Sequence, residues 1–200
     1  MARTPNVARR QNKREAILES ARNVFCRKGF NNVTMKDIIE ECGISRGGIY
    51  LYFKSVDDIF IEVVNQRNSH KFEDIRKSVK EGVSFPELLD SYFVTQKNRL
   101  LHMEESMLRS MYEYFFTHKS AEDRKFQQAQ LEHVKSTIME ILTLGVHQGI
   151  LRDENINSLA ENFMFLIEGL SVLALIGSLT EDRIDAQFSL IKVMLPLKSK

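Results

Sequence analysis

The sequence predicts an all-α protein of about nine helices, and three observations lead to this class. Apolar residues recur at intervals of three to four along nearly the whole chain, which is the period of an amphipathic helix. Only three prolines and nine glycines occur in 200 residues, too few for the many turns of an all-β protein. No segment shows a convincing strand pattern. A chain of this length forms one medium domain or two small ones with a real core.

Four helices are expected in the first 70 residues. Gly29 and Gly43 end the first two, because glycine readily adopts the left-handed conformation that closes a helix. The residues from Thr34 to Asp37 resemble a capping box, and Ser45 is placed to cap the third helix. The predicted helices cover about 13–28, 35–42, 46–53 and 56–70.

The remainder of the chain also follows a helical period. Pro86 suits the first turn of a helix, while Gly149, Gly177 and Pro196 mark breaks. The last two helices are apolar on more than one face, so they must be buried. The predicted helices cover about 86–103, 105–117, 121–148, 157–176 and 183–195.

The net charge of +1 hides an asymmetry along the chain. Residues 1–54 carry 11 Lys or Arg and 5 Asp or Glu, a balance of +6, whereas the other 146 residues carry 17 and 22, a balance of −5. A basic end and a mildly acidic remainder indicate one part that meets a polyanion and one that does not. A disordered solubilising tail is the alternative explanation of the basic end.

Several function classes lack their sequence signatures. No apolar segment of a signal peptide follows the basic tail, and the apolar stretch 163–176 is interrupted by Glu168, so it reads as a buried helix rather than a membrane span. A cytoplasmic location is predicted. Cys26 and Cys42 are too few for a disulfide framework, and the histidines lack HxxxH or HExxH spacing. No metal, cofactor or catalytic set is expected, and the chain is predicted not to be an enzyme.

Two short helices separated by the turn 41–45 have the layout of a helix-turn-helix. The second helix of such a motif places its N-terminal residues on base edges in the major groove. Ile49 and Phe53, four residues apart, would face the core. Four residues of this second helix are placed to face DNA, namely Arg46, Gly47, Gly48 and Tyr50.

The stretch from Ile17 to Ile59 carries a more specific pattern, ILESARNVFCRKGFNNVTMKDIIEECGISRGGIYLYFKSVDDI. An A-x-x-x-F-x-x-x-G-F entry is followed by a threonine before a short helix, then by G-I-S, G-x-I-Y-x-Y-F and an acidic start to the fourth helix. This pattern resembles the DNA-binding domain of TetR-family transcriptional repressors. The stretch Gly145–Leu151 and the pair Glu168-Gly169 resemble the family's ligand-binding half, so the resemblance extends loosely over the whole chain.

The resemblance implies four parts. They are a flexible basic arm at 1–12, a helix-turn-helix DNA-binding domain at 13–56, a connecting helix at 57–80, and an effector-binding and dimerisation domain at 81–200. In the family the last two helices pack against their copies as a four-helix dimer interface. A homodimer can set two recognition helices about 34–36 Å apart to read a palindrome.

The resemblance also implies DNA contacts. Thr34 would contact a phosphate through its hydroxyl and the helix amides, and Arg46 would read guanine with two hydrogen bonds. Tyr52 is either a phosphate contact or a core aromatic with an exposed hydroxyl. The predicted DNA-binding residues are Thr34, Lys36, Ser45, Arg46, Gly47, Gly48, Tyr50, Tyr52 and Lys54, with Arg9, Arg10, Lys13 and Arg14 from the arm.

Two positions depart from the family's pattern. The family often has Thr or Ser where this chain has Gly48, and it commonly has Lys in place of Val56. Each departure removes one expected contact to DNA. The basic arm is the predicted substitute, on the backbone or in a minor groove.

Soft, bulky apolar side chains gather in the C-terminal part. A stripe of methionines at helical spacing is usually core packing, but the resemblance implies a cavity for an apolar or amphipathic effector. Glu168 lies in the pocket, at the subunit interface or against a helix terminus. The predicted effector-binding residues are Phe93, Gln96, Met103, Met107, Met111, Tyr112, Phe115, Thr137, Phe163 and Ile167.

The leading hypothesis is a homodimeric repressor of double-stranded operator DNA that a small-molecule effector releases. The alternative is a helical small-molecule-binding or carrier protein without sequence-specific DNA binding, whose basic N-terminus only solubilises it. An unrecognised enzyme is the third hypothesis, and the missing acid–base or nucleophile set argues against it.

Overall fold

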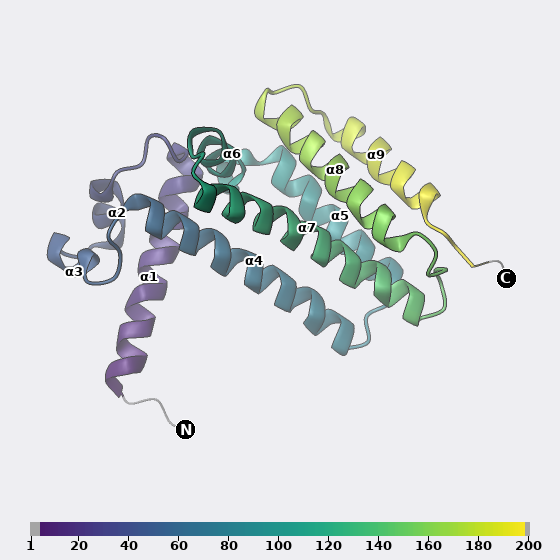
Figure 1. Ribbon diagram of the computed structural model, residues 1–200, viewed down its shortest axis with the longest axis horizontal. Coiled ribbons are helices and arrows are strands. Elements are labelled where there is room, and N and C mark those ends of the chain that lie inside the picture. The colour runs from purple at the N-terminus through teal and green to yellow at the C-terminus, as the bar shows by residue number, and fades with distance from the viewer. Residues whose placement is uncertain (1–4, 199–200) are drawn as a thin grey trace. The chain divides into compact units, whose positions relative to one another are not determined.

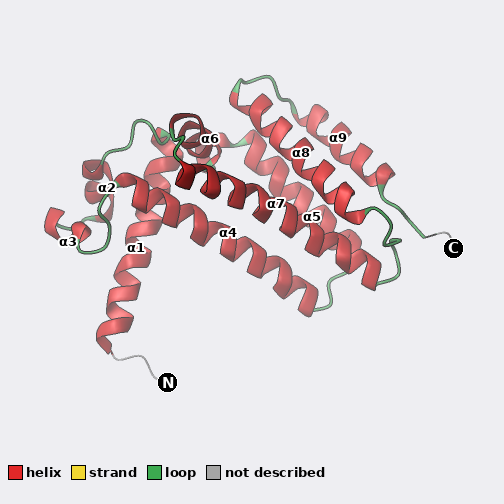
Figure 2. Cartoon of the chain, viewed as in Figure 1, coloured by secondary structure: helices red, strands yellow, loops and turns green. Residues whose placement is uncertain are grey.

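The computed structural model describes residues 5–198, and within them it contains nine α-helices, one 3-10 turn and no strand beyond an isolated bridge (Figure 2). The predicted all-α class is confirmed. The helices are α1 (Pro5–Lys28), α2 (Met35–Cys42), α3 (Arg46–Tyr50), α4 (Val56–Lys80), α5 (Phe85–Leu101), α6 (Leu108–Thr117), α7 (Ala121–His147), α8 (Ile156–Leu175) and α9 (Glu181–Met194).

The helix boundaries agree with the prediction in most places and differ in three. Helix α1 begins at Pro5, so residues 5–12 are helical rather than a flexible arm, while residues 1–4 lie outside the described residues. Pro5 marks a first turn, where proline fits, rather than a loop. Helix α4 continues to Lys80 instead of ending near residue 70. A 3-10 turn (Met103–Glu105) separates α5 from α6, which begins at Leu108 rather than at 105.

The chain divides into two compact units. Unit 1 comprises the described residues up to Arg67 together with Glu104–Thr117, and unit 2 comprises Asn68–Met103 and the described residues from His118 onward. Helix α6 therefore belongs with the first three helices and the start of α4, although the sequence placed it in the domain 81–200. The boundary within α4 also falls at Arg67, not at residue 56 or 80.

Unit 1 is centred on four aromatic rings. Phe60 of α4 lies 5.1 Å from Phe25 and 4.8 Å from Phe30, and Tyr114 of α6 lies 4.9 Å from Phe60 between ring centroids. All four side chains are buried. The Ser110 hydroxyl of α6 also donates to the Phe25 carbonyl at 2.8 Å. These contacts explain why α6 joins unit 1, because its inner face completes an aromatic core that the first four helices leave open.

Unit 2 is a layer of long helices in which α7 packs along α8, and α5 packs against α7, α8 and α9 (Figure 1). Phe93 of α5 stacks on Phe188 of α9 at 4.5 Å. The end of the described chain is held as well, since Leu197 bridges Leu151. The second half of α4 joins this unit through the Arg76–Glu140 ion pair at 3.7 Å.

Helix α8 is the one described helix that is long and apolar enough to cross a membrane. Length and composition alone are weak evidence for a span, because the core helix of a soluble protein passes the same test. Here α8 buries Phe163, Ile167 and Leu170, and it packs against α5 and α7, so one face of this helix belongs to the core of unit 2.

Candidate nucleic-acid interface

Helices α2 and α3 are joined by a tight turn. Gly43 ends α2 with φ +65°, in the left-handed region that favours glycine, and its N–H donates to the Ile39 carbonyl at 3.1 Å. Two residues later, Ser45 caps α3, and its hydroxyl oxygen accepts from the Gly48 N–H at 3.1 Å. The predicted turn residues thus produce a helix-turn-helix.

The start of α2 is fixed by a complete capping box. The Asp37 N–H donates to the Thr34 hydroxyl oxygen at 3.3 Å, and the Asp37 carboxylate accepts from the Thr34 N–H at 2.9 Å. Lys28 donates to the same carboxylate at 2.6 Å, and this hydrogen bond is the main cause that lowers the pKa of Asp37 to about 2. The Thr34 hydroxyl also donates to Asp37 at 2.9 Å. A phosphate contact through that hydroxyl would therefore have to replace this bond.

The first residues of α3 face outward while its last turn is anchored. Arg46 and Gly47 are exposed, whereas Ile49 is fully buried and Phe53 is 4% exposed. The core contacts predicted for Ile49 and Phe53 are confirmed. The helix therefore carries Arg46 on the surface while Ile49 anchors it in the core.

The two glycines of α3 differ in the space around them. A Cβ at Gly47 would meet nothing within 4 Å, whereas a Cβ at Gly48 would lie 3.1 Å from the Ser45 hydroxyl oxygen. The lack of a side chain at Gly48 thus leaves room for the Ser45 hydroxyl that caps α3. The lack of one at Gly47 leaves the exposed surface of α3 without a side chain at that position. A DNA backbone can approach such a face more closely than one that carries a side chain.

The remaining predicted contacts of this face are on the surface to different degrees. Tyr50 is 44% exposed, and Lys36 and Lys54 are exposed. Tyr52 is half-buried, and the Arg10 guanidinium lies 5.9 Å from the centre of its ring. Its burial is compatible with both alternatives, so the phosphate contact of Tyr52 stays a prediction.

The four basic residues predicted for the arm lie on α1 and are not equivalent. Arg9 and Lys13 are exposed. Arg14 is paired with Glu62 of α4 at 2.7 Å and lies 5.3 Å from the Phe53 ring centre. The guanidinium of Arg14 therefore already ties α1 to α4, which leaves Arg9, Arg10 and Lys13 as the better candidates for phosphate.

Several residues that hold this interface in place escaped the sequence analysis. Arg27 binds Glu41 with two hydrogen bonds of 3.2 and 2.6 Å, which joins the ends of α1 and α2. Hydrogen bonding to Arg27 is the main cause that lowers the pKa of Glu41. Glu113 of α6 accepts from the Asn31 N–H at 2.9 Å, although the two are far apart in sequence. No local pattern predicts such a pairing.

The geometry agrees with what comparisons with known proteins show. The family described as "Bacterial regulatory proteins, tetR family" matches residues 17–63. The uncharacterized HTH-type transcriptional regulator YfiR of Bacillus subtilis is 30% identical over 163 residues, which cover 80% of this chain and 79% of that protein. The chain belongs to the TetR family.

Solved structures share the fold of this TetR-family regulator over most of its length. A putative transcriptional regulator from Saccharomonospora viridis in complex with choline has a TM-score of 0.71 and 23% identity, covering 94% of this chain and 100% of its own. The regulator FadR from Bacillus subtilis in complex with stearoyl-CoA has a TM-score of 0.67 and 19% identity, covering 88% of this chain and 96% of its own. The chain is thus a transcriptional regulator with a DNA-binding helix-turn-helix, in a family whose members are not enzymes.

The predicted effector-binding residues of this TetR-family regulator are divided between the two units. Within unit 1, Tyr112 lies 6.1 Å from Phe115 between ring centroids. Within unit 2, Phe93 lies 6.4 Å from Phe163. Unit 1 holds Met107, Met111, Tyr112 and Phe115, and unit 2 holds Phe93, Gln96, Met103, Thr137, Phe163 and Ile167.

The burial of these candidates shows which ones pack the core. Met107, Phe163 and Ile167 are at most 1% exposed. The Thr137 hydroxyl donates to the His133 carbonyl of its own helix at 2.8 Å. Gln96 is 7% exposed and stands out as a polar side chain inside unit 2. Among the described residues, no group of three or more His, Cys, Asp or Glu side chains could hold a metal ion.

Proposed function

We propose that this TetR-family regulator binds a palindromic operator as a cytoplasmic homodimer, represses transcription there, and is released by a small apolar or amphipathic effector. The observation that carries the DNA-binding half is the pair of exposures on α3, where Arg46 faces outward and Ile49 is fully buried. A recognition helix needs this arrangement, because base readout requires an exposed donor on a helix that the core holds in place. The basic end of the chain adds the sequence-independent attraction to phosphate.

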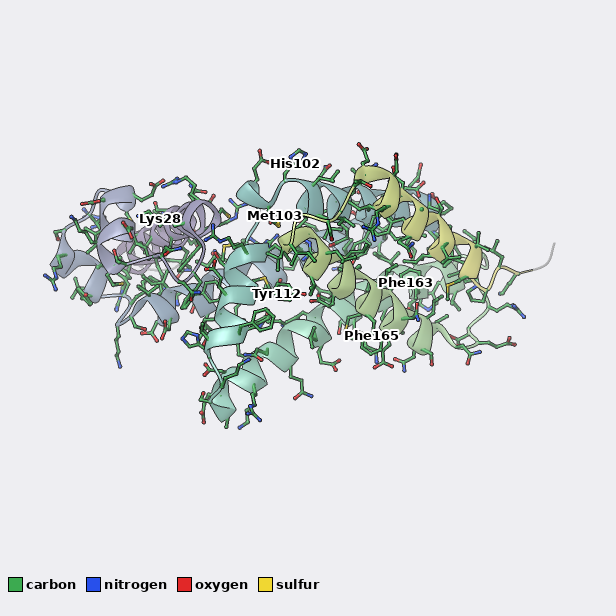
Figure 3. The ribbon with its side chains drawn as sticks, turned by 90° about the horizontal axis from the view of Figure 1, so that it is seen from above. Lys28, His102, Met103, Tyr112, Phe163 and Phe165 are labelled. Carbon is green, nitrogen blue, oxygen red and sulfur yellow. The ribbon has the colours of Figure 1, made fainter. Side chains whose placement is uncertain are left out.

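The surface of α8 and α9 supports dimerisation. Phe165, Val172 and Ile176 at and just beyond α8 are 62%, 44% and 69% exposed, and on α9 Leu190 and Val193 are 53% and 80% exposed. Figure 3 labels Phe165 beside Phe163, which is two residues earlier on α8 and fully buried. An apolar face of this kind marks an interaction site, and a second copy of the same face is the partner that a palindromic operator needs.

The effector half of the proposal draws on the family. Structures with the same fold were solved with choline and with stearoyl-CoA. These two ligands differ in charge and size, so the fold by itself does not select one chemistry. The effector would favour a state whose two recognition helices no longer match the operator, and by linkage the operator must weaken effector binding by the same factor.

Operator binding is tested by fluorescence anisotropy with the purified full-length protein and the intergenic DNA next to its own gene. We expect saturable binding with two chains per operator and much weaker binding to a scrambled duplex at the same salt concentration. Equal affinity for both duplexes would contradict sequence-specific repression and leave the small-molecule-binding alternative in its place.

A further inference from the structure

One face of α5 carries polar side chains into the interior of unit 2. Tyr92, Gln96 and Arg99 are spaced by four and three residues, so they line one side of the helix. Tyr92 and Gln96 are each only 7% exposed. Buried polar groups are ordinarily hydrogen-bonded, so the partners of these three side chains indicate what the face is for.

Arg99 is only partly satisfied. Its Nη2 donates to the Ser171 hydroxyl oxygen of α8 at 2.9 Å, and that hydroxyl donates in turn to the Ile167 carbonyl at 2.7 Å. The Nε of Arg99 is buried and is the one such side-chain nitrogen or oxygen in the described part of the chain that has no hydrogen-bond partner. A guanidinium is always charged and has no acceptor atom, so only an incoming acceptor can satisfy this N–H.

The other two side chains of this face, Tyr92 and Gln96, also carry hydrogen-bond donors. The Gln96 side chain is 7% exposed, and its amide carries two N–H donors and one acceptor oxygen. Burial is the main cause that raises the pKa of Tyr92, with Arg99 and Glu168 near enough to act in opposite directions. The Tyr92 hydroxyl therefore keeps its proton and remains a donor.

We propose that this face of α5, together with Ser171 of α8, binds the carboxylate of an effector that has an apolar body. The inference rests on the proposed function and names the effector's chemical class. The three side chains supply donors, and a carboxylate supplies two acceptor oxygens in the plane that a guanidinium fork fits. Glu168 adds one negative charge near Tyr92, which opposes any anion and opposes a phosphate of two charges more than a carboxylate of one.

The surroundings account for the apolar body. Phe93, Phe163 and Ile167 lie on the same two helices as the polar face and are 5%, 0% and 1% exposed. A ligand that bound Arg99 through its carboxylate would have to pack its apolar body against these side chains. This is the common composition of a ligand site, in which a few polar groups orient a mostly apolar molecule.

Calorimetric titration of the full-length protein with octanoate, octanol, octylamine and octyl phosphate tests the class of ligand. Octanoate should bind about tenfold or more tightly than octanol, because the alcohol leaves the charged donor without an anionic acceptor. Octylamine and octyl phosphate should also bind more weakly than octanoate. Equal affinity for octanoate and octanol, or tighter binding of either charged alternative, would overturn the proposal.

Arg99→Met tests the residue, with Lys97→Met as the control on the same helix. Lys97 pairs with Asp185 at 2.9 Å and Glu181 at 3.1 Å, away from the proposed face. We expect Arg99→Met to abolish the preference for octanoate over octanol and Lys97→Met to retain it. A preference that survives Arg99→Met would overturn the assignment.

Gln96→Met separates a ligand contact from a structural role. If the amide serves a ligand rather than a hydrogen bond within the protein, an apolar side chain of similar size should leave the melting temperature of the ligand-free protein unchanged or raise it. The same substitution should weaken octanoate binding severalfold. A lower melting temperature together with unchanged octanoate affinity would show a structural role and contradict the proposal.

Measuring operator binding with and without octanoate distinguishes a failure of this inference from a failure of the proposed function. Octanoate should release the wild-type protein from its operator and should not release the Arg99→Met variant. If the protein binds the operator specifically but no carboxylate binds or releases it, the proposed site is wrong and the repressor function stands. If no operator is bound at all, the repressor function fails while the titrations still decide the carboxylate site.

Discussion

The two units of the molecule are held together in different ways. In unit 1 the helices that form the DNA-reading face are short, and side chains fix their ends, as Asp37 does for α2 and Ser45 does for α3. In unit 2 long helices pack along one another, and the inner face of α5 keeps the Arg99 Nε without an acceptor. The fixed helix ends suit a surface that must hold its geometry before it meets DNA, and the unsatisfied Arg99 donor suits the effector site proposed in unit 2.

The largest effect is expected on the outer surface of unit 2. Phe165→Glu places a charge on the exposed apolar face of α8, so it should convert a dimer into a monomer at micromolar concentration, because like charges would face each other across the two-fold axis. Analytical ultracentrifugation measures the mass. Phe116→Glu on α6 is the matched control, since Phe116 is 67% exposed in unit 1. A variant at residue 165 that remains dimeric would remove this face as the interface.

The aromatic core of unit 1 gives the next largest effect. Phe60→Ala should lower the free energy of unfolding of unit 1 by about 3–5 kcal/mol, because it leaves a cavity among the three other rings. Hydrogen exchange read by mass spectrometry locates the loss. Exchange should accelerate in α1 to α3 and remain slow in α7 and α8. Uniform acceleration would show that the two units unfold as one.

Alanine substitutions at Gly29 in unit 1 and at Gly177 in unit 2 compare the turns of the two units. Both have φ near +70°, which costs an alanine roughly 1–2 kcal/mol. A Cβ at Gly29 would also lie 2.6 Å from a Glu113 carboxylate oxygen, whereas nothing lies within 4 Å at Gly177. Gly29→Ala should therefore destabilise more than Gly177→Ala in urea unfolding, because Glu113 must move from Asn31. Equal losses of unfolding free energy for the two substitutions would show that the Glu113 side chain of α6 moves aside at little cost.

Substitutions in the capping boxes should have the smallest effect on the free energy of unfolding, and the effect at Asp37 should depend on pH. Asp37 has its pKa lowered to about 2, mainly by Lys28, so its stabilising contribution is present above about pH 4 and is lost as the pH falls towards 2. Asp37→Asn should lower the free energy of unfolding at pH 7 by about 1 kcal/mol. The difference from wild type should shrink between pH 4 and pH 2.

The control for this experiment is Glu87 in unit 2. Its pKa is also lowered, but by Ser84 alone and with no lysine. Glu87→Gln should cost less than Asp37→Asn, because glutamine can close the same capping box. If the gap between Asp37→Asn and wild type stayed constant over this pH range, the Lys28 pair would contribute nothing to the stability of α2.

The sequence predicted the local features of unit 1 well and its long-range contacts poorly. Gly43, Ser45 and the capping box at Thr34 act within a few residues, so their roles follow from spacing alone. The start of α1 was placed too late, because Pro5 was read as a loop residue instead of a first turn. The place of α6 in unit 1 depends on Tyr114 meeting Phe60, and no short-range pattern predicts that contact.

The effector region shows the same limit in a stronger form. The resemblance implied a cavity lined by Met103, Met107 and Met111, but Met103 belongs to unit 2 whereas Met107 and Met111 belong to unit 1. Gln96 was predicted from the sequence as an effector-binding residue, whereas Arg99 and Ser171, which the proposed carboxylate site also uses, were not. Their pairing joins two helices at a sequence distance that periodicity does not reach.

The claim that α3 reads the operator is tested most directly by Arg46→Ala in a competition between operator and scrambled DNA at fixed salt. Lys36→Ala, an exposed lysine on α2, is the control for loss of charge. Arg46→Ala should lose about 1–3 kcal/mol of discrimination at each half-site while the melting temperature stays unchanged, and Lys36→Ala should weaken both duplexes alike. If Arg46→Ala kept the wild-type ratio of affinities, Arg46 would not be the residue that reads the operator.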